Sequence, residues 1–513
     1  MAKNCLCLTA KTIDRNLEIL NKYRKFADIA ELRVDCLDPD ERLSIRRFPE
    51  LAGIPVILTI RRDIDGGQFS GGEGARVKLL ARGLAFANAD TRLNFAYVDI
   101  EDDLKVPSLE EAARTFGTRI IRSYHDLEGE TVDISAKIKS MQRTGDEIVK
   151  MAVAVKTTSD VLRIYRASRN CAVKNKIVIC MGHLGIYSRI LAEKFGSMIT
   201  YSTALSENEA AGAAGQLDVR DLAEIYRIRK VSKKTRIYGV TGFPLKATIS
   251  PWFFNSIFAM ENIDAVYCPF PTDSIGSLLK LARELDVQGL SVTVPYKEEV
   301  LPELIKYSKS VLNVRACNTV FPVDGEWFGN NTDITGFSDS LLTFINKKNL
   351  KRQKITIVGA GGAARAVAAE VYRLGGKALI LNRTANKAKS LALLYNFRWE
   401  VLDDRGIELI SKFSDIIIQT TSVGMEGHEI ADPLEMYSFT GKEAVMDLIY
   451  MPEKTLFLKR AEDAGCKILN GYDMVIRQAC LQYQIFTGKE LPQKLISRIK
   501  PLGENTWTKI RTV

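Results

Sequence analysis

A glycine-rich turn between two apolar runs is the clearest sign of chemistry in this chain. The run 355–358 leads directly into Gly359-Ala360-Gly361-Gly362-Ala363. A segment with helical periodicity then extends to Leu374, and a second apolar run, 378–381, ends at Asn382. Strand, glycine turn, helix and strand in this order place a dinucleotide pyrophosphate on the backbone N–H groups of a helix N-terminus. Glycine suits the turn because a Cβ would keep a phosphate away from the backbone.

The residues after the second apolar run indicate which dinucleotide fits. An NAD site usually carries Asp or Glu there, to bind the ribose hydroxyls. This chain has Asn382, Arg383 and Thr384, with Lys387 one turn later. Two cations in place of an acid predict a ribose 2′-phosphate and hence NADP(H). The alternative is a tight strand-to-helix turn that holds no ligand.

A lysine and a histidine in the first half could carry a second kind of chemistry. Lys150 lies inside the apolar run 148–153, and His125 follows the run 119–123. Burial disfavours a charged amine, and a neutral amine attacks a ketone to form a Schiff base, which acts as an electron sink. A histidine can remove the acidified α-proton and return it to a leaving hydroxyl. The alternative is that Lys150 points outward and His125 caps a helix.

A lysine and an aspartate in the second half suggest proton transfer. Lys297 ends the strand-like run 289–297, and Asp333 follows two asparagines. Reduction of a ketone needs a hydride on one face and a proton donor at the oxygen. A Lys–Asp pair can supply that proton, because the carboxylate orients the ammonium. A surface ion pair of little consequence is the alternative, since the sequence cannot show that the two residues meet.

The elements that must position the first set recur regularly. Eight short apolar runs are separated by amphipathic stretches, and they cover 5–9, 29–34, 56–60, 95–100, 119–123, 148–153, 176–181 and 198–202. This rhythm predicts a (β/α)8 barrel, with a doubly wound open sheet as the alternative. Barrel chemistry lies at the C-terminal ends of the strands. Arg33 and Arg61 lie at the ends of the second and third runs, Arg189 follows the seventh, and the three would hold a carboxylate and hydroxyls.

Composition and length set the wider limits. A chain of 513 residues predicts two to four domains. We expect a barrel over 1–228, a basic linker over 227–236, an α/β unit over 236–340, the glycine-turn unit over 350–480, and helix or coil over 481–513. The charge of +10 is spread along the chain, which does not favour a nucleic-acid partner.

Other classes of protein are disfavoured by what the sequence lacks. No apolar run is long enough to span a membrane, and the first residues show no secretory or transit signal, so we expect a cytoplasmic protein. Nine scattered cysteines do not form a disulfide framework. Cys180 and His183 make a single C-x-x-H pair, which we interpret as a buried thiol at a strand end rather than a metal site.

Motifs of the first half carry a family resemblance: ELRVD (31–35), TIRR followed by GGQ (59–68), SYHD (123–126), the strand lysine Lys150 and GIYSRILAEKFGS (185–197). On these residues, nearly all of 4–225 resembles type I 3-dehydroquinate dehydratase. The resemblance implies that Lys150 forms an imine with the substrate and that His125 is the general base and acid. It also implies a substrate pocket lined by Glu31, Arg33, Arg61, Arg189 and Gln216. Asp65, Gly212 and Cys7 depart from the family pattern.

Motifs of the second half carry a second family resemblance: VTVPYKE (292–298), NTV (318–320), NNTD (330–333), VGAGGAAR (358–365), NRT (382–384), TSVGM (421–425), DLIY (447–450) and GYDMVIRQA (471–479). On these, 236–490 resembles shikimate dehydrogenase. The resemblance implies Lys297 and Asp333 as the catalytic pair. The implied substrate contacts are Thr248, Ser250, Thr293, Asn318, Tyr450 and Gln478. The implied NADP contacts are Gly359, Ala360, Gly361, Gly362, Ala363, Asn382, Arg383, Thr384, Lys387, Leu448 and Gly471.

Together these features predict an α/β chain with an N-terminal (β/α)8 barrel followed by a two-lobed dehydrogenase with a Rossmann NADP-binding domain. The order resembles that of plant-type bifunctional enzymes. The barrel would dehydrate 3-dehydroquinate, and the second half would reduce 3-dehydroshikimate to shikimate with NADPH; no metal, membrane or nucleic acid is expected. Thr248 and Ser291 depart from the family pattern, and Thr248 leaves a preference for quinate open. A ligand-sensing regulator is the other alternative, although it should have lost its catalytic side chains.

Overall fold

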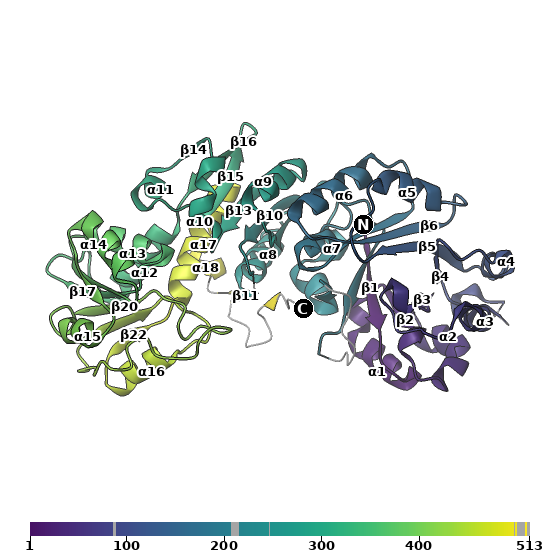
Figure 1. Ribbon diagram of the computed structural model, residues 1–513, viewed down its shortest axis with the longest axis horizontal. Coiled ribbons are helices and arrows are strands. Elements are labelled where there is room, and N and C mark those ends of the chain that lie inside the picture. Colours follow the sequence, from purple (N-terminus) through teal and green to yellow (C-terminus); the bar gives the residue numbers. More distant parts are fainter. Residues whose placement is uncertain (86–88, 207–214, 246, 497, 500–507, 510–513) are drawn as a thin grey trace. The chain divides into compact units, whose positions relative to one another are not determined.

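The computed structural model describes residues 1–513 apart from 86–88, 207–214, 246, 497, 500–507 and 510–513 (Figure 1). The chain divides into two compact units, Met1–Leu290 with Ser497–Val513, and Ser291–Ile496. The division falls within β13 (Val287–Val292), a strand that belongs to both. The domain limits expected from the sequence stay predictions beside this division.

A curled parallel sheet forms the first part of unit 1, and it confirms the predicted barrel class. Its strands are β1 (Lys3–Leu8), β2 (Ile29–Arg33), β3 (Val56–Thr59), β4 (Tyr97–Glu101), β5 (Arg119–Asp126), β6 (Ile148–Ala154), β7 (Lys176–Met181) and β8 (Ile199–Thr203). Each of them pairs with its successor from β1 to β7, and β8 returns to pair with β1. Between β7 and β8, Met198 N–H donates to Lys176 O over 2.9 Å. A short strand, β9 (Leu217–Asp218), lies beside β8.

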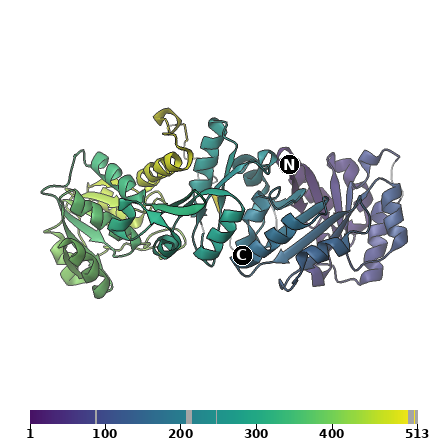
Figure 2. The same ribbon diagram turned by 90° about the horizontal axis from the view of Figure 1, so that it is seen from above.

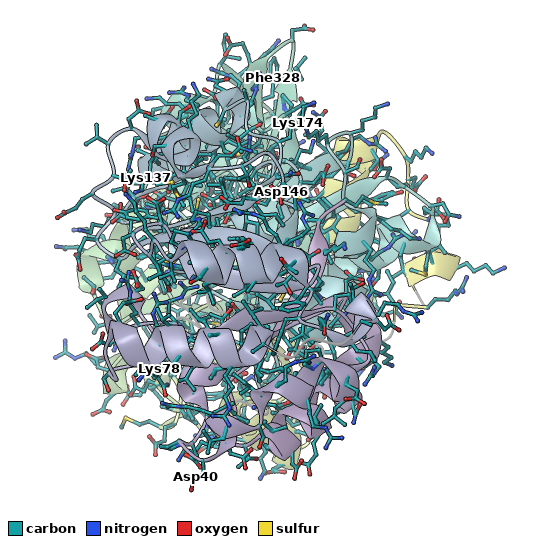
Figure 3. The ribbon with its side chains drawn as sticks, turned by 90° about the vertical axis from the view of Figure 1, so that its right-hand side faces the viewer. Asp40, Lys78, Lys137, Asp146, Lys174 and Phe328 are labelled. Carbon is teal, nitrogen blue, oxygen red and sulfur yellow. The ribbon has the colours of Figure 1, made fainter. Side chains whose placement is uncertain are left out.

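Helices cover the outside of this sheet (Figures 1 and 2). They are α1 (Ile13–Tyr23), α2 (Phe48–Ala52), α3 (Glu73–Leu84), α4 (Pro107–Thr115), α5 (Ile134–Met141), α6 (Thr158–Asn170) and α7 (Tyr187–Ile190). Figure 3 faces this layer, and Lys78 of α3 lies on its outer surface, in front of the strands. The sequence starts α6 with a capping box in which Thr157 and Asp160 bond each other's backbone N–H.

Alternate residues of the strands fill the interior of the sheet. Apolar inward positions form one buried cluster, which includes Ile29, Tyr97, Ile121, Ile148 and Ile199. Side chains two residues further along a strand point the same way. The next inward layer is therefore polar, and it lies closer to the C-terminal ends of the strands. Its members are Glu31, Thr59, Asp99, Ser123, Lys150 and Tyr201.

The segment expected to be a linker packs on the barrel. Within it, Ile228 is 1% exposed and Val231 is 2% exposed, while Arg229 pairs with Asp28 at 2.9 Å. The prediction of a linker over 227–236 rested on its basic composition and overlooked two buried apolar residues, Ile228 and Val231. The rest of unit 1 is a small α/β lobe with β10 (Arg236–Thr241), β11 (Ala247–Thr248), α8 (Ser250–Met260), β12 (Ala265–Pro269) and α9 (Ile275–Glu284).

Unit 2 begins with irregular elements around a hairpin. They are α10 (Tyr296–Glu299), β14 (Lys306–Tyr307), α11 (Lys309–Val314), β15 (Thr319–Val323), β16 (Glu326–Asn330) and α12 (Asp333–Phe344). β15 and β16 pair antiparallel, and β14 adds to β16 in parallel. The turn between β16 and α12 carries the Asn-Asn-Thr-Asp motif.

A six-stranded parallel sheet follows, and its strand order confirms the Rossmann prediction. The strands are β17 (Lys354–Val358), β18 (Lys377–Asn382), β19 (Arg398–Val401), β20 (Ile416–Gln419), β21 (Ala444–Asp447) and β22 (Lys467–Leu469). They are arranged β19-β18-β17-β20-β21-β22, so the order reverses between β17 and β20. In doubly wound sheets, a dinucleotide binds at this reversal, beyond the C-terminal ends of the strands.

Helices lie on both faces of this sheet (Figure 1). One face packs on α12, α13 (Gly362–Arg373) and α14 (Ala385–Tyr395). The other packs on α15 (Asp404–Ile410) and α16 (Leu456–Asp463). α17 (Tyr472–Thr487) runs through the boundary expected at 480/481 and is followed by α18 (Gln493–Ile496) and β23 (Thr508–Lys509). Within the described ranges, no helix is long and apolar enough to cross a membrane.

Candidate active sites

The Lys150 amine lies inside the barrel. Its Nζ is 2.9 Å from Asp99 Oδ2, 3.9 Å from Glu31 Oε1 and 4.4 Å from the ring centre of Tyr201. The residue is only 5% exposed. The strand pattern therefore brings a reactive amine to the inner layer, and the alternative of an outward lysine does not hold.

Asp99 links this amine to Arg61. Arg61 Nη2 is 2.8 Å from Asp99 Oδ2, and Arg61 Nη1 is 2.5 Å from Glu101 Oε1. Ser123 Oγ donates to Asp99 Oδ1, and Arg76 binds Glu101 from outside the barrel. Burial alone would raise the pKa of Asp99, but the charges of Arg61 and Lys150 hold it well below its usual value.

Glu31 and Gln216 meet at Cys7. The Glu31 carboxylate accepts from Thr59 Oγ1 at 2.9 Å and from Cys7 Sγ at 3.1 Å, while Gln216 Nε2 donates to Cys7 Sγ at 3.5 Å. Burial, and then the nearby charge of Glu31, raise the pKa of the Cys7 thiol. The thiol that departs from the family pattern thus lies in the predicted pocket.

His125 is neutral at pH 7. Burial is the main cause that lowers its pKa well below 6.5, and the charges of Arg61 and Lys150 act in the same direction. Its Nδ1 is buried and has no hydrogen-bond partner among the described residues. A helix-capping role is excluded, since His125 lies within β5. The neutral ring can therefore accept a proton, and it lies near the charges of Arg61 and Lys150.

The two remaining arginines take different positions. Arg33 forms a two-bond pair with Asp35, at 2.9 and 2.7 Å, and Asp35 also accepts from the N–H of Arg61. Arg189, on α7, is 3% exposed, and burial lowers its pKa to about 10. The nearby thiols of Cys7 and Cys180 act in the opposite direction on the pKa of Arg189.

The sequence reasoning missed Asp99, Glu101 and Tyr201. A signal was present, because Asp99 and Glu101 share the inward parity of Tyr97 on an apolar strand. The departure at Asp65 lies outside the cluster, since this residue pairs with Arg62 at 2.6 Å. Gly212 lies outside the described residues. Among the described residues, no group of His, Cys, Asp and Glu side chains could hold a metal ion.

In unit 2, Lys297 and Asp333 do meet. Lys297 Nζ is 2.6 Å from Asp333 Oδ2, and their side chains are 22% and 15% exposed. Asp333 is the first residue of α12, where a carboxylate is favoured by the helix dipole. The backbone O of Lys297 accepts from Cys317 N–H at 2.7 Å, which fixes α10 beside the hairpin.

Asn318 holds the other oxygen of Asp333. Its Nδ2 donates to Asp333 Oδ1 at 2.8 Å, and its Oδ1 accepts from the N–H of Thr332 at 2.8 Å. Gln478 Oε1, on α17, lies 3.3 Å from Asn318 Nδ2. Gln482 supports this group through Asn318 O and was not expected from the sequence. Thr293 lies one turn before Lys297 and accepts from Tyr296 N–H.

Thr248 and Ser250 belong to unit 1. Ser250 N–H donates to Thr248 Oγ1 at 3.2 Å, and α8 begins at Ser250, directly before Pro251. Thr248 is 7% exposed. Their role as substrate contacts stays a prediction.

The glycine turn fits a dinucleotide. Gly359 has a φ of +113°, and a Cβ there would lie 2.5 Å from Thr420 Oγ1. In contrast, a Cβ on Gly361 or Gly362 would meet nothing within 4 Å, so open space lies in front of the α13 N-terminus. That space is at the reversal between β17 and β20, where a pyrophosphate would accept from the backbone N–H groups.

The residues expected at the adenosine ribose lie at the end of β18. Asn382 Nδ2 donates to Thr384 O at 3.1 Å, while Arg383 and Lys387 are exposed, with no ion pair recorded within the described chain. On the other side of the reversal, Gly471 approaches Leu448 so closely that a Cβ would lie 2.0 Å from Leu448 O. Tyr450 lies two residues after Leu448, and burial raises the pKa of its hydroxyl to about 12. Ala360 belongs to the same turn, and Ala363 is the second residue of α13.

A barrel with a buried amine, followed by a dinucleotide-type sheet with a Lys–Asp pair, defines an enzyme of two catalytic parts. The chain belongs to the shikimate dehydrogenase family: residues 240–320 match its substrate binding domain, and 342–426 match the shikimate/quinate 5-dehydrogenase model. Residues 4–233 match type I 3-dehydroquinase. The chain thus joins a dehydroquinase and a shikimate dehydrogenase, in that order.

The chain is similar to the following three proteins, among others. The NADP(+) shikimate dehydrogenase of Caldanaerobacter subterraneus is 36% identical over 266 residues, which are 51% of this chain and 94% of the relative. The chloroplastic bifunctional 3-dehydroquinate dehydratase/shikimate dehydrogenase of Arabidopsis thaliana is 27% identical over 96% of this chain and 83% of its own. The crystal structure of Aquifex aeolicus shikimate dehydrogenase is 34% identical, with a TM-score of 0.47, over 52% of this chain and 97% of that one.

Proposed function

We propose that the chain catalyses two consecutive steps on one cyclic acid. The barrel dehydrates 3-dehydroquinate to 3-dehydroshikimate, and the second part reduces that product to shikimate with NADPH. The observation that carries the proposal is the Lys150 amine, 2.9 Å from Asp99 in the barrel interior and accompanied by a neutral His125.

In the barrel, Lys150 Nζ bonds to the ketone carbon of the substrate, and the ketone oxygen leaves as water. The resulting iminium withdraws electrons from the neighbouring carbon. His125 takes the proton from that carbon, and the electron pair forms the ring double bond as the hydroxyl leaves. The proton on His125 passes to the leaving hydroxyl, so a second water departs. Water then cleaves the imine and restores the amine.

Cationic side chains of the pocket hold the acid during these steps. Arg189 is buried beside Cys7 and is the best placed to bind the substrate carboxylate, because the guanidinium of Arg61 is already paired with Asp99 and Glu101. Glu31 and Gln216 offer an acceptor and an amide to the ring hydroxyls. Arg33 positions Asp35, which in turn fixes the backbone of Arg61.

In the second part, Lys297 delivers a proton to the carbonyl oxygen, and Asp333 orients the ammonium. Asn318 keeps the carboxylate in place. Thr248, Ser250, Thr293, Tyr450 and Gln478 are proposed substrate contacts. NADPH would supply the hydride when bound. Gly359, Ala360, Gly361, Gly362 and Ala363 would hold its pyrophosphate, and Asn382, Arg383, Thr384 and Lys387 its 2′-phosphate; Leu448 and Gly471 are further proposed contacts.

A coupled assay tests the whole proposal. Addition of 3-dehydroquinate to the protein with NADPH should cause a loss of absorbance at the NADPH band, and borohydride should fix a covalent adduct on Lys150. A folded protein that neither oxidises NADPH nor forms the adduct would favour the ligand-sensing alternative. Comparison of NADP+ reduction with shikimate and with quinate decides the substrate preference that Thr248 leaves open. A cytoplasmic location and independence of metal ions stay predictions.

A further inference from the structure

The small lobe of unit 1 packs on two catalytic-face turns of the barrel. The turn after β6, the strand of Lys150, starts α6, and α6 packs along α9 of the lobe. Arg166 of α6 binds Glu284 of α9, and its Nε is 2.7 Å from Glu284 Oε1. The turn after β7 leads to α7, which packs near β12 of the lobe. Both turns belong to the rim where barrel chemistry takes place.

A carboxylate of the lobe caps a helix of the barrel. Asp273 Oδ1 accepts from Thr158 N–H at 2.8 Å and from Thr158 Oγ1 at 2.6 Å. Burial alone would raise the pKa of Asp273, but the bonds from Thr158 keep it below its usual value. Thr158 and Thr272 are fully buried, and their hydroxyls lie 2.7 Å apart. The contact thus combines two buried hydroxyls with a charge-assisted cap from the exposed Asp273.

An aromatic pair makes the second joint. The rings of Tyr187 on α7 and Phe270 after β12 lie 4.8 Å apart, and both residues are fully buried. Gly239 of β10 makes room for Phe270, because a Cβ there would lie 2.4 Å from its ring. The phenyl ring is therefore held between the lobe's own sheet and the barrel's Tyr187.

Helix α7 depends on such contacts for its position. It has four residues, and a helix of one turn has no stability of its own in water. Three consecutive residues of it have different neighbours. Tyr187 packs on Phe270, Ser188 Oγ accepts from Cys180 N–H of β7 at 3.3 Å, and Arg189 is buried, at 3% exposed. Loss of the contact between Tyr187 and Phe270 would loosen α7 and, with it, the position of Arg189.

We infer that Phe270, in the reductase lobe, is a positioning residue for the dehydratase. It acts through Tyr187 on Arg189, so the lobe forms part of the support of the dehydratase pocket. The inference rests on the proposed dehydratase function of the barrel. It explains why a lobe that carries reductase residues Thr248 and Ser250 also carries a buried ring that faces the neighbouring domain.

Steady-state kinetics of the full chain test this inference. Phe270→Ala should raise the KM for 3-dehydroquinate about ten-fold and change kcat less than about two-fold, because the loosened arginine binds substrate but transfers no proton. Tyr187→Leu should have the same effect, and the double variant should be no worse than either single one. Tyr187→Phe keeps the ring and removes a hydroxyl with no partner among the described residues, so it should keep the wild-type KM.

Two controls distinguish a positioning role of Phe270 from a general loss of stability. Phe258→Ala truncates another buried ring of the same lobe, one that packs on Tyr238 and Phe254, and should lower the unfolding temperature without raising this KM. Oxidation of shikimate should be unchanged in Phe270→Ala. Where that variant does not fold, Phe270→Leu takes its place, with a smaller effect of the same kind.

The outcomes distinguish the inference from the function on which it rests. Wild-type protein without dehydratase activity would overturn the proposed function. Active wild type together with an unchanged KM in a folded Phe270 variant, or an equal loss of both activities, would overturn the positioning role alone.

Discussion

The Lys150 amine lies among charges that compensate one another. Asp99 is fully enclosed and touches both Lys150 and Arg61, so its removal leaves two buried cations without their shared carboxylate. We predict that Asp99→Asn lowers dehydratase turnover about 100-fold, since the amine is no longer held toward the substrate. Asp103→Asn is the matched control, because Asp103 is 63% exposed and pairs with Arg62 outside the interior. Equal activity of both variants would show that Asp99 has no catalytic importance.

The low pKa of His125 should set the acid limit of the proposed dehydratase reaction. In the proposed mechanism the neutral ring is the base, and burial with nearby cations lowers the pKa of His125 in the folded protein well below 6.5. The unfolded chain takes up this proton first as the pH falls, so the site also disfavours folding on the acid side. We predict that dehydratase kcat/KM is flat from pH 7 to about pH 6.5 and falls only below it. A fall that begins above pH 7, measured over that range, would contradict the assignment.

Some of the candidate site residues can be predicted from the sequence and others cannot. Lys150 and His125 were predicted because a titratable residue stands out in an apolar strand. Asp99 and Glu101 follow from the same rule once the inward parity of β4 is fixed by Tyr97. In contrast, the meeting of Lys297 with Asp333 depends on the path of the hairpin β15–β16, which no local pattern encodes.

At the scale of elements, the turn before α13 combines two kinds of glycine. Gly362 begins the helix and faces open space, so Gly362→Ala should not lower the unfolding temperature. The new methyl group would enter the space proposed for the pyrophosphate, and we predict that the KM for NADPH rises at least about ten-fold. Gly359→Ala should instead lower the free energy of unfolding by about 1–3 kcal/mol, because of its positive φ and the contact with Thr420. Cofactor titration and thermal unfolding of both variants check the contrast.

The turn after β18 decides between the two dinucleotides. Arg383 is exposed and is proposed to bind the 2′-phosphate, which NADH lacks. We predict that Arg383→Ala raises the KM for NADPH about ten-fold or more and leaves the KM for NADH within about two-fold. Arg398→Ala, at the opposite end of the neighbouring β19, is the control with the same change of charge. An equal rise of the KM for NADPH and the KM for NADH would mean that Arg383 supports the fold rather than binding the 2′-phosphate.

The elements themselves were largely predictable. Short apolar runs located all eight barrel strands, because parallel strands buried on both faces are continuously apolar. The packing of 227–236 was not foreseen, since Ile228 and Val231 are hidden among basic residues. Nor was the joint between α6 and α9, which is made by small polar residues such as Thr158 and Asp273 that do not stand out in a sequence.

For the whole molecule, the two activities should differ in how far they can be separated. The match to the single-function shikimate dehydrogenase of Caldanaerobacter subterraneus covers 94% of that protein, so we expect a fragment that begins at residue 234 to retain the reductase activity. The barrel, in contrast, packs α6 and α7 on the lobe that this cut removes. Its separation would expose Tyr187 and Thr158, which are buried in the intact chain.

We therefore predict that fragment 234–513 oxidises shikimate with a kcat within about three-fold of the full chain, whereas fragment 1–233 shows a KM for 3-dehydroquinate raised about ten-fold or more. The barrel fragment should also unfold at a lower temperature, because it loses the Asp273 cap on α6 and exposes the buried Thr158 hydroxyl to water. Mixing the two fragments at increasing concentration should restore the dehydratase KM, since the joint can then form again in trans. A barrel fragment with the KM of the intact chain would show that its pocket needs no support from the reductase lobe.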